Sequence, residues 1–284
     1  MANILPFDRQ VEIIAALTES VSIRATERLT GVHRDTIMRL GVRVGVGCEK
    51  IHDTMMRGLH VPRLELDEAW SYVGKKQKKV QEHELETKGD QYVFIALAGA
   101  AKAIIAYYTG KRTLESTRAF LWDLRERVYG APEIISDGFN AYPKAVEEAF
   151  GANCVFGTIE KHYRAPVFIE AARRYSPAEV VSVTTRAVRG QPMHFSTSYV
   201  ERQNLSLRMA QRRFTRLTNA FSKKLENHYA AVALYVSHYN LCRVHEALRI
   251  TPAMQLGVTD HVWSIGELVY AALTGEVAHR SAVA

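Results

Sequence analysis

Three acidic residues that are far apart in the sequence could together bind divalent metal ions. Asp67 lies within the apolar segment RLELDEAWSYVG, where a charge is costly unless it is paired or bound to a cation. Asp137 ends the segment EIISD just before Gly138, and Glu201 precedes five arginines in TSYVERQNLSLRMAQRRFTRL. Carboxylates are hard ligands that suit Mg²⁺ or Mn²⁺ and do not point to zinc. Two such ions, about 3.5 to 4 Å apart, can activate a water or a 3′ hydroxyl against a phosphodiester.

Two of these carboxylates also have a structural interpretation when each is taken alone. An aspartate before a glycine is common in turns and at helix caps, so Asp137 could be a turn residue. Glu201 could be a solvated surface charge or a partner of a helix dipole, because glutamate is favourable in a first helical turn. The combination of three acids with intervals long enough for further strands and helices favours a metal centre.

A helix through residues 199–217 would place Glu201 beside a row of basic side chains. At about 100° per residue, the side chains within about 60° of Glu201 are those of Asn204, Leu205, Arg208, Arg212 and Arg216. The other side would carry Tyr199, Leu207, Ala210, Phe214 and Leu217. We therefore expect the apolar side to pack on the protein, and Arg202, Asn204, Arg208 and Arg212 to hold a DNA backbone.

The elements that would position the acids follow in the order of an α/β fold. The patterns predict a strand at 63–74, a strand pair at 92–108, a helix at 113–130, a strand at 133–137, a helix at 142–150 and a strand at 153–159. This order is typical of a ribonuclease-H-like fold, a mixed sheet flanked by helices. Residues 160–195 are expected to be less regular, because Pro166, Gly190 and scattered charges break any periodicity.

Helices are expected on both sides of this central part. Residues 1–60 predict a helix-turn-helix, in which the second helix would contact DNA through Arg34, Thr36, Arg39 and Arg43. A plain helical hairpin fits the same pattern. After residue 217, helices are expected at 223–248 and 263–275. The sequence thus predicts a helix-turn-helix DNA-binding region at 1–60, a catalytic domain at 61–225 and a helical C-terminal region at 226–284.

The composition of the 284 residues favours a folded protein with a polyanionic partner. Hydrophobic residues make up 47% of the chain, the net charge is +7 and the pI is near 9.3. The three cysteines are far apart and form neither a disulfide framework nor a zinc pattern, and no signal peptide is expected, so a cytoplasmic location fits. Lys102 and Gly99 interrupt the longest apolar run, which argues for two strands and against a membrane span.

Four separated motifs, in order, resemble the DDE transposases of bacterial insertion sequences, and most closely the Insertion Sequence One family. The motifs are LDEAWSYVGKK, ISDGFNAYPKAV, TSYVERQNLSLRMAQRRFTRLTNAFSKK and HYNLCRVHEALRITPAM. The resemblance covers residues 62 to about 265, and the N-terminal helices are similar to that family's DNA-reading part. It implies a ribonuclease-H-like domain in which Asp67, Asp137 and Glu201 hold two catalytic metal ions. It also implies cleavage of double-stranded DNA at element ends and joining of the 3′ hydroxyl ends to target DNA.

The resemblance also bears on DNA contacts and on partners. Asn204 and Arg208 fall where the family carries polar residues beside its active site, and Arg243 and His245 would touch DNA unless His245 is an ordinary surface residue. In contrast to many members, the chain has no cluster of cysteines and histidines that could form an N-terminal zinc module. Joining two ends requires two or more protomers, so we expect a homo-oligomer on DNA. Alternatives are a non-catalytic repressor or domesticated remnant, and a stand-alone nuclease.

Overall fold

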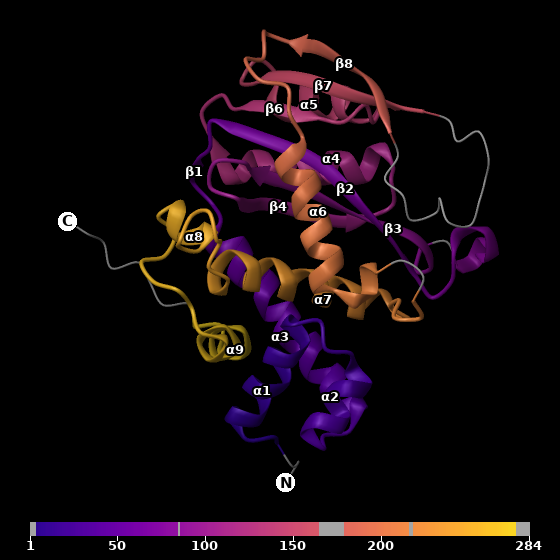
Figure 1. Ribbon diagram of the computed structural model, residues 1–284, viewed down its shortest axis with the longest axis vertical. Coiled ribbons are helices and arrows are strands. Elements are labelled where there is room, and N and C mark those ends of the chain that lie inside the picture. Colours follow the sequence, from indigo (N-terminus) through magenta and orange to yellow (C-terminus); the bar gives the residue numbers. More distant parts are fainter. Residues whose placement is uncertain (1–3, 85, 165–178, 216–217, 277–284) are drawn as a thin grey trace.

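A six-stranded mixed sheet forms the centre of the computed structural model, which describes residues 4–84, 86–164, 179–215 and 218–276 (Figure 1). The strand order is β4-β3-β2-β6-β7-β8. The bounds are β2 Arg63–Val73, β3 Gly89–Ala98, β4 Ala103–Gly110, β6 Glu133–Ser136, β7 Val155–Tyr163 and β8 Val180–Arg189. β2 is antiparallel to β3 and parallel to β6; β3 and β4 form an antiparallel pair, β6 and β7 a parallel one, and β7 and β8 an antiparallel one. Two short strands, β1 (Leu59–His60) and β5 (Val128–Tyr129), pair separately.

The side chains of β2 point alternately to two differently packed faces of the sheet. Because successive side chains on a strand point to opposite faces, Leu64 and Leu66 enter one apolar cluster, whereas Asp67 and Ala69 face the other side. Both strands of the β3–β4 hairpin are apolar and buried along most of their length, as expected for strands covered on both faces. The sheet therefore needs helices on each side.

Helices cover both faces of this sheet. α4 (Leu114–Arg127) and α5 (Tyr142–Phe150) pack on the face that carries Leu64 and Leu66. On the opposite face, α6 (Ser198–Ala210) crosses β2 and β3, and α7 (Leu225–Ser237) follows it (Figure 1). The side chains of Val200, Leu207 and Val232 close the apolar cluster on that side. The face with Asp67 is thus covered by α6.

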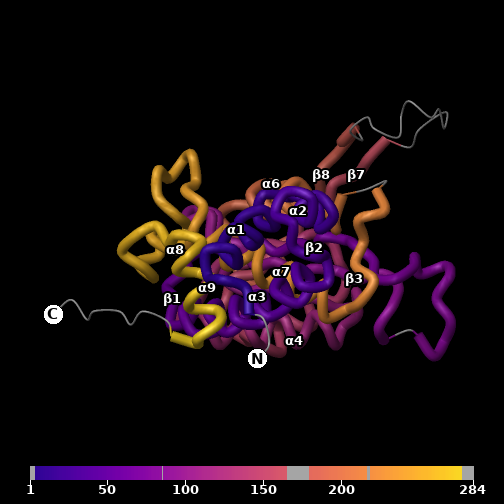
Figure 2. Tube along the Cα trace, turned by 90° about the horizontal axis from the view of Figure 1, so that it is seen from below, coloured from indigo at the N-terminus to yellow at the C-terminus, as the bar shows by residue number. Residues whose placement is uncertain are grey.

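The remaining helices gather at the end of the molecule opposite β8 (Figures 1 and 2). They are α1 (Phe7–Thr18), α2 (Ile23–Thr30), α3 (Arg34–Met55) and α9 (Ile265–Thr274), with the short α8 (Pro252–Gln255) nearby. α3 packs closely on α7 and α9 through Gly45 and Gly47, which have no Cβ. A Cβ at Gly45 would collide with the backbone of Ala230, and one at Gly47 with the backbone of Ala272. One continuous apolar core includes Ile37 of α3, residues of the sheet and Leu268 of α9, so it spans all three predicted regions.

Most of the predicted elements are confirmed. The strands and helices expected between residues 63 and 159 are present, and α2 and α3 form the predicted helix, turn and helix, with Gly31 in the left-handed conformation at the turn. The recognition of DNA by α2 and α3 stays a prediction. No helix in the described ranges combines the length and hydrophobicity needed to cross a bilayer.

Two expectations were partly wrong. Within 160–195, β7 continues to Tyr163 and β8 pairs with it along Val180–Arg189, and this pair extends outward (Figure 2), whereas residues 190–195 form no strand or helix, as expected. The helix expected over 223–248 is shorter. α7 ends at Ser237, a π turn covers His238–Cys242, and residues 243–250 form no regular helix.

Candidate metal centre

The parallel pairing of β2 with β6 brings Asp67 and Asp137 together. The register places Leu66 opposite Ser136, which is the last residue of β6. Asp67 is the next residue of β2, and Asp137 is the first residue after β6, so both carboxylates lie where the paired part of the two strands ends. This position, at the carboxyl end of a parallel strand, is where ligands bind in open α/β sheets.

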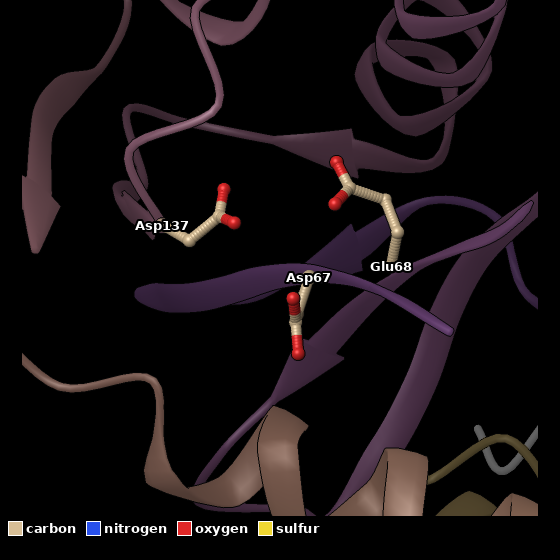
Figure 3. Close-up of side chains that lie close together, drawn as sticks. All are labelled: Asp67, Glu68 and Asp137. Carbon is tan, nitrogen blue, oxygen red and sulfur yellow. The ribbon is translucent and has the colours of Figure 1, made fainter. Parts of the chain in front are cut away.

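A third carboxylate, Glu68, lies at the same place (Figure 3). One oxygen atom from each of Asp67, Glu68 and Asp137 lies within 4.8 Å of the others. Asp67 and Glu68 are consecutive on β2, so their side chains start toward opposite faces of the sheet. The pairing with β6 ends at Leu66 and Ser136, which leaves this edge of β2 open beyond that point, and both carboxylates can reach it. Sequence reasoning missed Glu68, although two consecutive acids in the apolar segment LELDEAW were a visible signal.

The pKa values of these carboxyls are raised because the groups are poorly solvated and repel one another. Burial raises the pKa of Asp67 to about 6, and the charges of Asp137 and Glu201 add to the shift. Burial, together with Asp137, raises the pKa of Glu68 to about 8. The pKa of Asp137 is also raised, chiefly by burial. Bringing a cation among them would relieve this repulsion.

Arg112 provides one positive charge on the α4 side of the cluster. Its Nη2 atom lies 3.4 Å from Oε2 of Glu68 and 3.5 Å from Oδ2 of Asp137. The guanidinium stacks over the ring of Phe139, 4.1 Å from the ring centroid. The backbone N–H of Phe139 donates a 3.0 Å hydrogen bond to Oδ1 of Asp137. Asp137 is therefore held from two sides.

Glu201 lines the same cleft as Asp67 and Asp137, from the first turn of α6. The cleft has a volume of about 520 Å³. Its lining comprises Asp67, Asp137, Gly138, Ile159–Tyr163, Thr197, Glu201, Asn204 and Arg208. Glu201 is not among the three closest carboxylates. Nζ of Lys161 pairs with it at 2.6 Å, and Oγ1 of Thr197 donates to it at 2.6 Å. The cleft thus contains all three acids found from the sequence, with Glu201 engaged by a lysine.

The predicted orientation of the Glu201 helix was partly wrong. The buried side chains of α6 are Val200, Gln203, Asn204 and Leu207, whereas Tyr199 is 48% exposed. Asn204 does not belong to an outward row, because it is only 2% exposed and its Nδ2 donates a 2.7 Å hydrogen bond to Oδ2 of Asp67.

α6 also ends earlier than predicted, at Ala210. Arg212 therefore does not lie on the helical face of Glu201, but in a separate 3₁₀ turn at Arg212–Phe214. Arg216 and Leu217 lie outside the described residues. The long basic helix face expected from the sequence is thus interrupted after its third turn.

The other predicted DNA contacts fall into two groups. Arg208 lines the cleft, and Arg202 is exposed on α6 away from the cleft lining. α3 carries the exposed side chains of Arg34, Arg39 and Arg43 and the half-buried Thr36, and it lies among the helices at the end of the molecule opposite β8 (Figure 1).

No known family model matches this chain, and no curated protein matches it either. The donor set consists of hard oxygens: three clustered carboxylates, Glu201 across the cleft, and the buried Oδ1 of Asn204, which has no hydrogen-bond partner among the described residues. These residues fit a hard divalent cation such as Mg²⁺.

Proposed function

We propose that this chain is a DDE transposase that cleaves double-stranded DNA at the ends of an insertion sequence and joins the 3′ hydroxyl ends to target DNA. The observation that carries the proposal is the convergence of Asp67, Asp137 and Glu201, from three separate elements, on one open cleft. Glu201 is more than sixty residues from Asp137, so the convergence depends on the tertiary fold. The resemblance of four motifs to transposases supports the same activity.

The arrangement of strands supports a ribonuclease-H-like catalytic domain. The first three strands of the sheet, β2, β3 and β4, follow one another with antiparallel pairing, and β6 and β7 then add in parallel on the other side of β2. In this arrangement the first acid lies on the central strand and the second follows its parallel neighbour. The glutamate comes from a helix packed across the same strand.

Asp67, Asp137 and Glu201 would hold two Mg²⁺ or Mn²⁺ ions, with Glu68 close enough to take part. When bound, these ions would lower the pKa of the attacking hydroxyl and offset the charge on the leaving oxygen of a phosphodiester. The protein residues orient the substrate. Arg208 lines the cleft, where its charge would hold a phosphate of the DNA backbone.

The helix-turn-helix at α2 and α3 would bind the element ends. The exposed side of α3 carries Thr36, Arg39 and Arg43 at spacings of three and four residues, which form one stripe along the helix. Because two ends have to be joined, we propose a homo-oligomer assembled on DNA in the bacterial cytoplasm.

Glu201→Gln tests the catalytic proposal on duplexes that carry the DNA flanking the coding sequence. The amide keeps the size of the side chain but removes its charge, so Mg²⁺-dependent cleavage and strand transfer should be abolished while DNA binding in a mobility-shift assay remains. Glu226→Gln, an exposed glutamate of α7, is the matched control and should retain both activities. Strand transfer retained by Glu201→Gln would contradict the proposal, and wild-type protein that binds but never cleaves would favour a repressor.

A further inference from the structure

Glu65 has a buried carboxylate for which the chemistry proposed above has no use. It lies on β2 two residues before Asp67, so both side chains emerge on the same face of the sheet. Glu65 is only 1% exposed. A carboxylate taken out of water is strongly destabilising unless hydrogen bonds replace its lost solvation, so its partners explain its presence.

The partners of Glu65 are backbone groups at the start of α6. Its Oε2 atom accepts hydrogen bonds from the backbone N–H of Tyr199, at 2.9 Å, and of Val200, at 3.0 Å. The first turn of a helix leaves its N–H groups without partners inside the helix. The residue before α6, Thr197, does not cap the helix with its side chain. Glu65 therefore caps α6 from another element of the fold.

A second hydrogen bond fixes the register of α6 on β2. Asp67 accepts from Asn204, one helical turn beyond the residues that Glu65 contacts. Residues two apart on a strand are about 6.6 to 6.8 Å apart, and four residues of helix rise by about 6 Å. The spacing along the strand thus matches the spacing along the helix. Two bonded points prevent α6 from sliding along β2 or turning on it.

The turn between β3 and β4 holds the same end of α6. Nζ of Lys102 lies 3.1 Å from the centroid of the Tyr199 ring. A Cβ on Gly99 would lie 2.8 Å from Cδ2 of Tyr199, so the backbone approaches this ring closely. The first turn of α6 is therefore held by β2 and by the turn between β3 and β4, and Glu201 directly follows the two anchored residues.

We propose that Glu65 is a positioning residue that sets the distance between Glu201 and Asp67 by anchoring the first turn of α6 on β2. The anchoring itself follows from the hydrogen bonds. Its consequence, a correctly assembled metal centre, rests on the proposed function. The residue acts through Glu201 and does not itself contact metal or DNA.

The test combines a measure of the anchor with a measure of metal binding. In Glu65→Ala, hydrogen exchange at the amides of Tyr199 and Val200 should accelerate, and Mn²⁺ affinity measured by electron paramagnetic resonance should fall by about tenfold to 100-fold. Glu65→Gln keeps an acceptor oxygen at the same place and should lie between Glu65→Ala and the wild type. It also keeps the test informative if Glu65→Ala fails to fold.

Tyr235→Phe is the matched control for loss of stability alone. It removes the 2.7 Å hydrogen bond from Nε2 of Gln203 to the Tyr235 hydroxyl, which weakens the packing of α6 without touching its first turn. This variant should unfold more easily and keep the wild-type affinity for Mn²⁺. If Glu65 had only a structural role, Glu65→Ala would likewise unfold more easily and keep the wild-type affinity for Mn²⁺.

The outcomes separate this inference from the proposed function. Equal Mn²⁺ affinity in wild-type protein, Glu65→Ala and Glu65→Gln would overturn the positioning role, as would unchanged exchange at Tyr199 and Val200. If the wild-type protein binds Mn²⁺ with an affinity that depends on Glu65 but cleaves no DNA, transposition would be contradicted and the positioning role would stand. Wild-type protein that binds no Mn²⁺ would overturn both.

Discussion

Asn204 donates a hydrogen bond of 2.7 Å from Nδ2 to Oδ2 of Asp67, and this bond joins α6 to β2 inside the cleft. Both residues line the cleft that also contains Asp137 and Glu201. The bond therefore orients a carboxylate of the central strand by means of the helix that carries the opposing glutamate. It gives a direct way to disturb the geometry of the site while keeping all of its acids.

Asn204→Leu should slow Mg²⁺-dependent cleavage by about tenfold to 100-fold, because removing a hydrogen-bond partner of a metal ligand has effects of this size. Leucine has a similar volume, so the packing of α6 should change little. Binding to flanking DNA should remain, as measured by mobility shift. The control is Ser206→Ala, which removes only a bond to the Arg202 carbonyl on the same helix. A wild-type cleavage rate in Asn204→Leu would show that Asp67 needs no such orientation.

Lys161→Gln should lower the Mg²⁺ concentration needed for half-maximal cleavage. Lys161 pairs with both carboxylate oxygens of Glu201, so it competes with a cation for this ligand. Glu201 is 42% exposed, and ion pairs at such sites contribute about 0.2 to 1 kcal/mol, which corresponds to at most about a fivefold change. Lys144→Gln, on the exposed side of α5, is the control. An increased Mg²⁺ requirement would mean that Lys161 assists the site instead of competing with the metal.

Local patterns were sufficient to predict the sheet and two of its acids. The alternation of Leu64 and Leu66 with polar residues marks β2, and Gly138 after a short apolar run marks the end of β6. The clustered carboxylate Glu68 could not be assigned to the site by strand periodicity, which places it on the face opposite Asp67. Only the end of β6 at Ser136 leaves both side chains free to turn to one edge.

Contacts between distant segments account for what the sequence did not reveal. Glu65 reads as a polar residue on an alternating strand, and its role depends on a helix more than a hundred residues later. The end of α6 at Ala210 has no glycine or proline to signal it. The chain leaves the helix there, and Arg213 reaches Ser222 with a 2.9 Å hydrogen bond. Tertiary contacts of this kind can override helical propensity, and no local pattern predicts them.

In the metal-free protein, Asp67 and Glu68 should make the free energy of unfolding decrease as the pH rises. Their pKa values are raised from 3.8 to about 6 and from 4.5 to about 8, so the folded state binds these protons more tightly than the unfolded state. The associated stability is complete below pH 3.8 for Asp67 and below pH 4.5 for Glu68. It is lost as the pH rises through about 6 and about 8, respectively, with a combined effect on the order of a few kcal/mol.

Urea unfolding in EDTA, compared between wild-type protein and the Asp67→Asn/Glu68→Gln variant, isolates this contribution. Other groups titrate in both proteins, so the difference between the two curves reports on the two acids. The variant should gain stability relative to the wild type as the pH rises from about 4 to about 8, and Mg²⁺ should reduce that gain. A pH-independent difference would show that these carboxyls are not perturbed.

Arg39→Ala should weaken binding to flanking DNA more than it weakens cleavage of pre-nicked DNA. Arg39 is exposed on α3 beside Thr36 and does not line the cleft, so its loss should affect recognition and not the chemistry. If Arg39 contacts a phosphate, the negative slope of log affinity against log salt concentration should decrease in magnitude by about one in Arg39→Ala. Lys50→Ala, an exposed residue near the other end of α3, is the control and should leave binding unchanged. Equal losses of binding and cleavage in Arg39→Ala would indicate a folding defect and remove the support for a recognition helix.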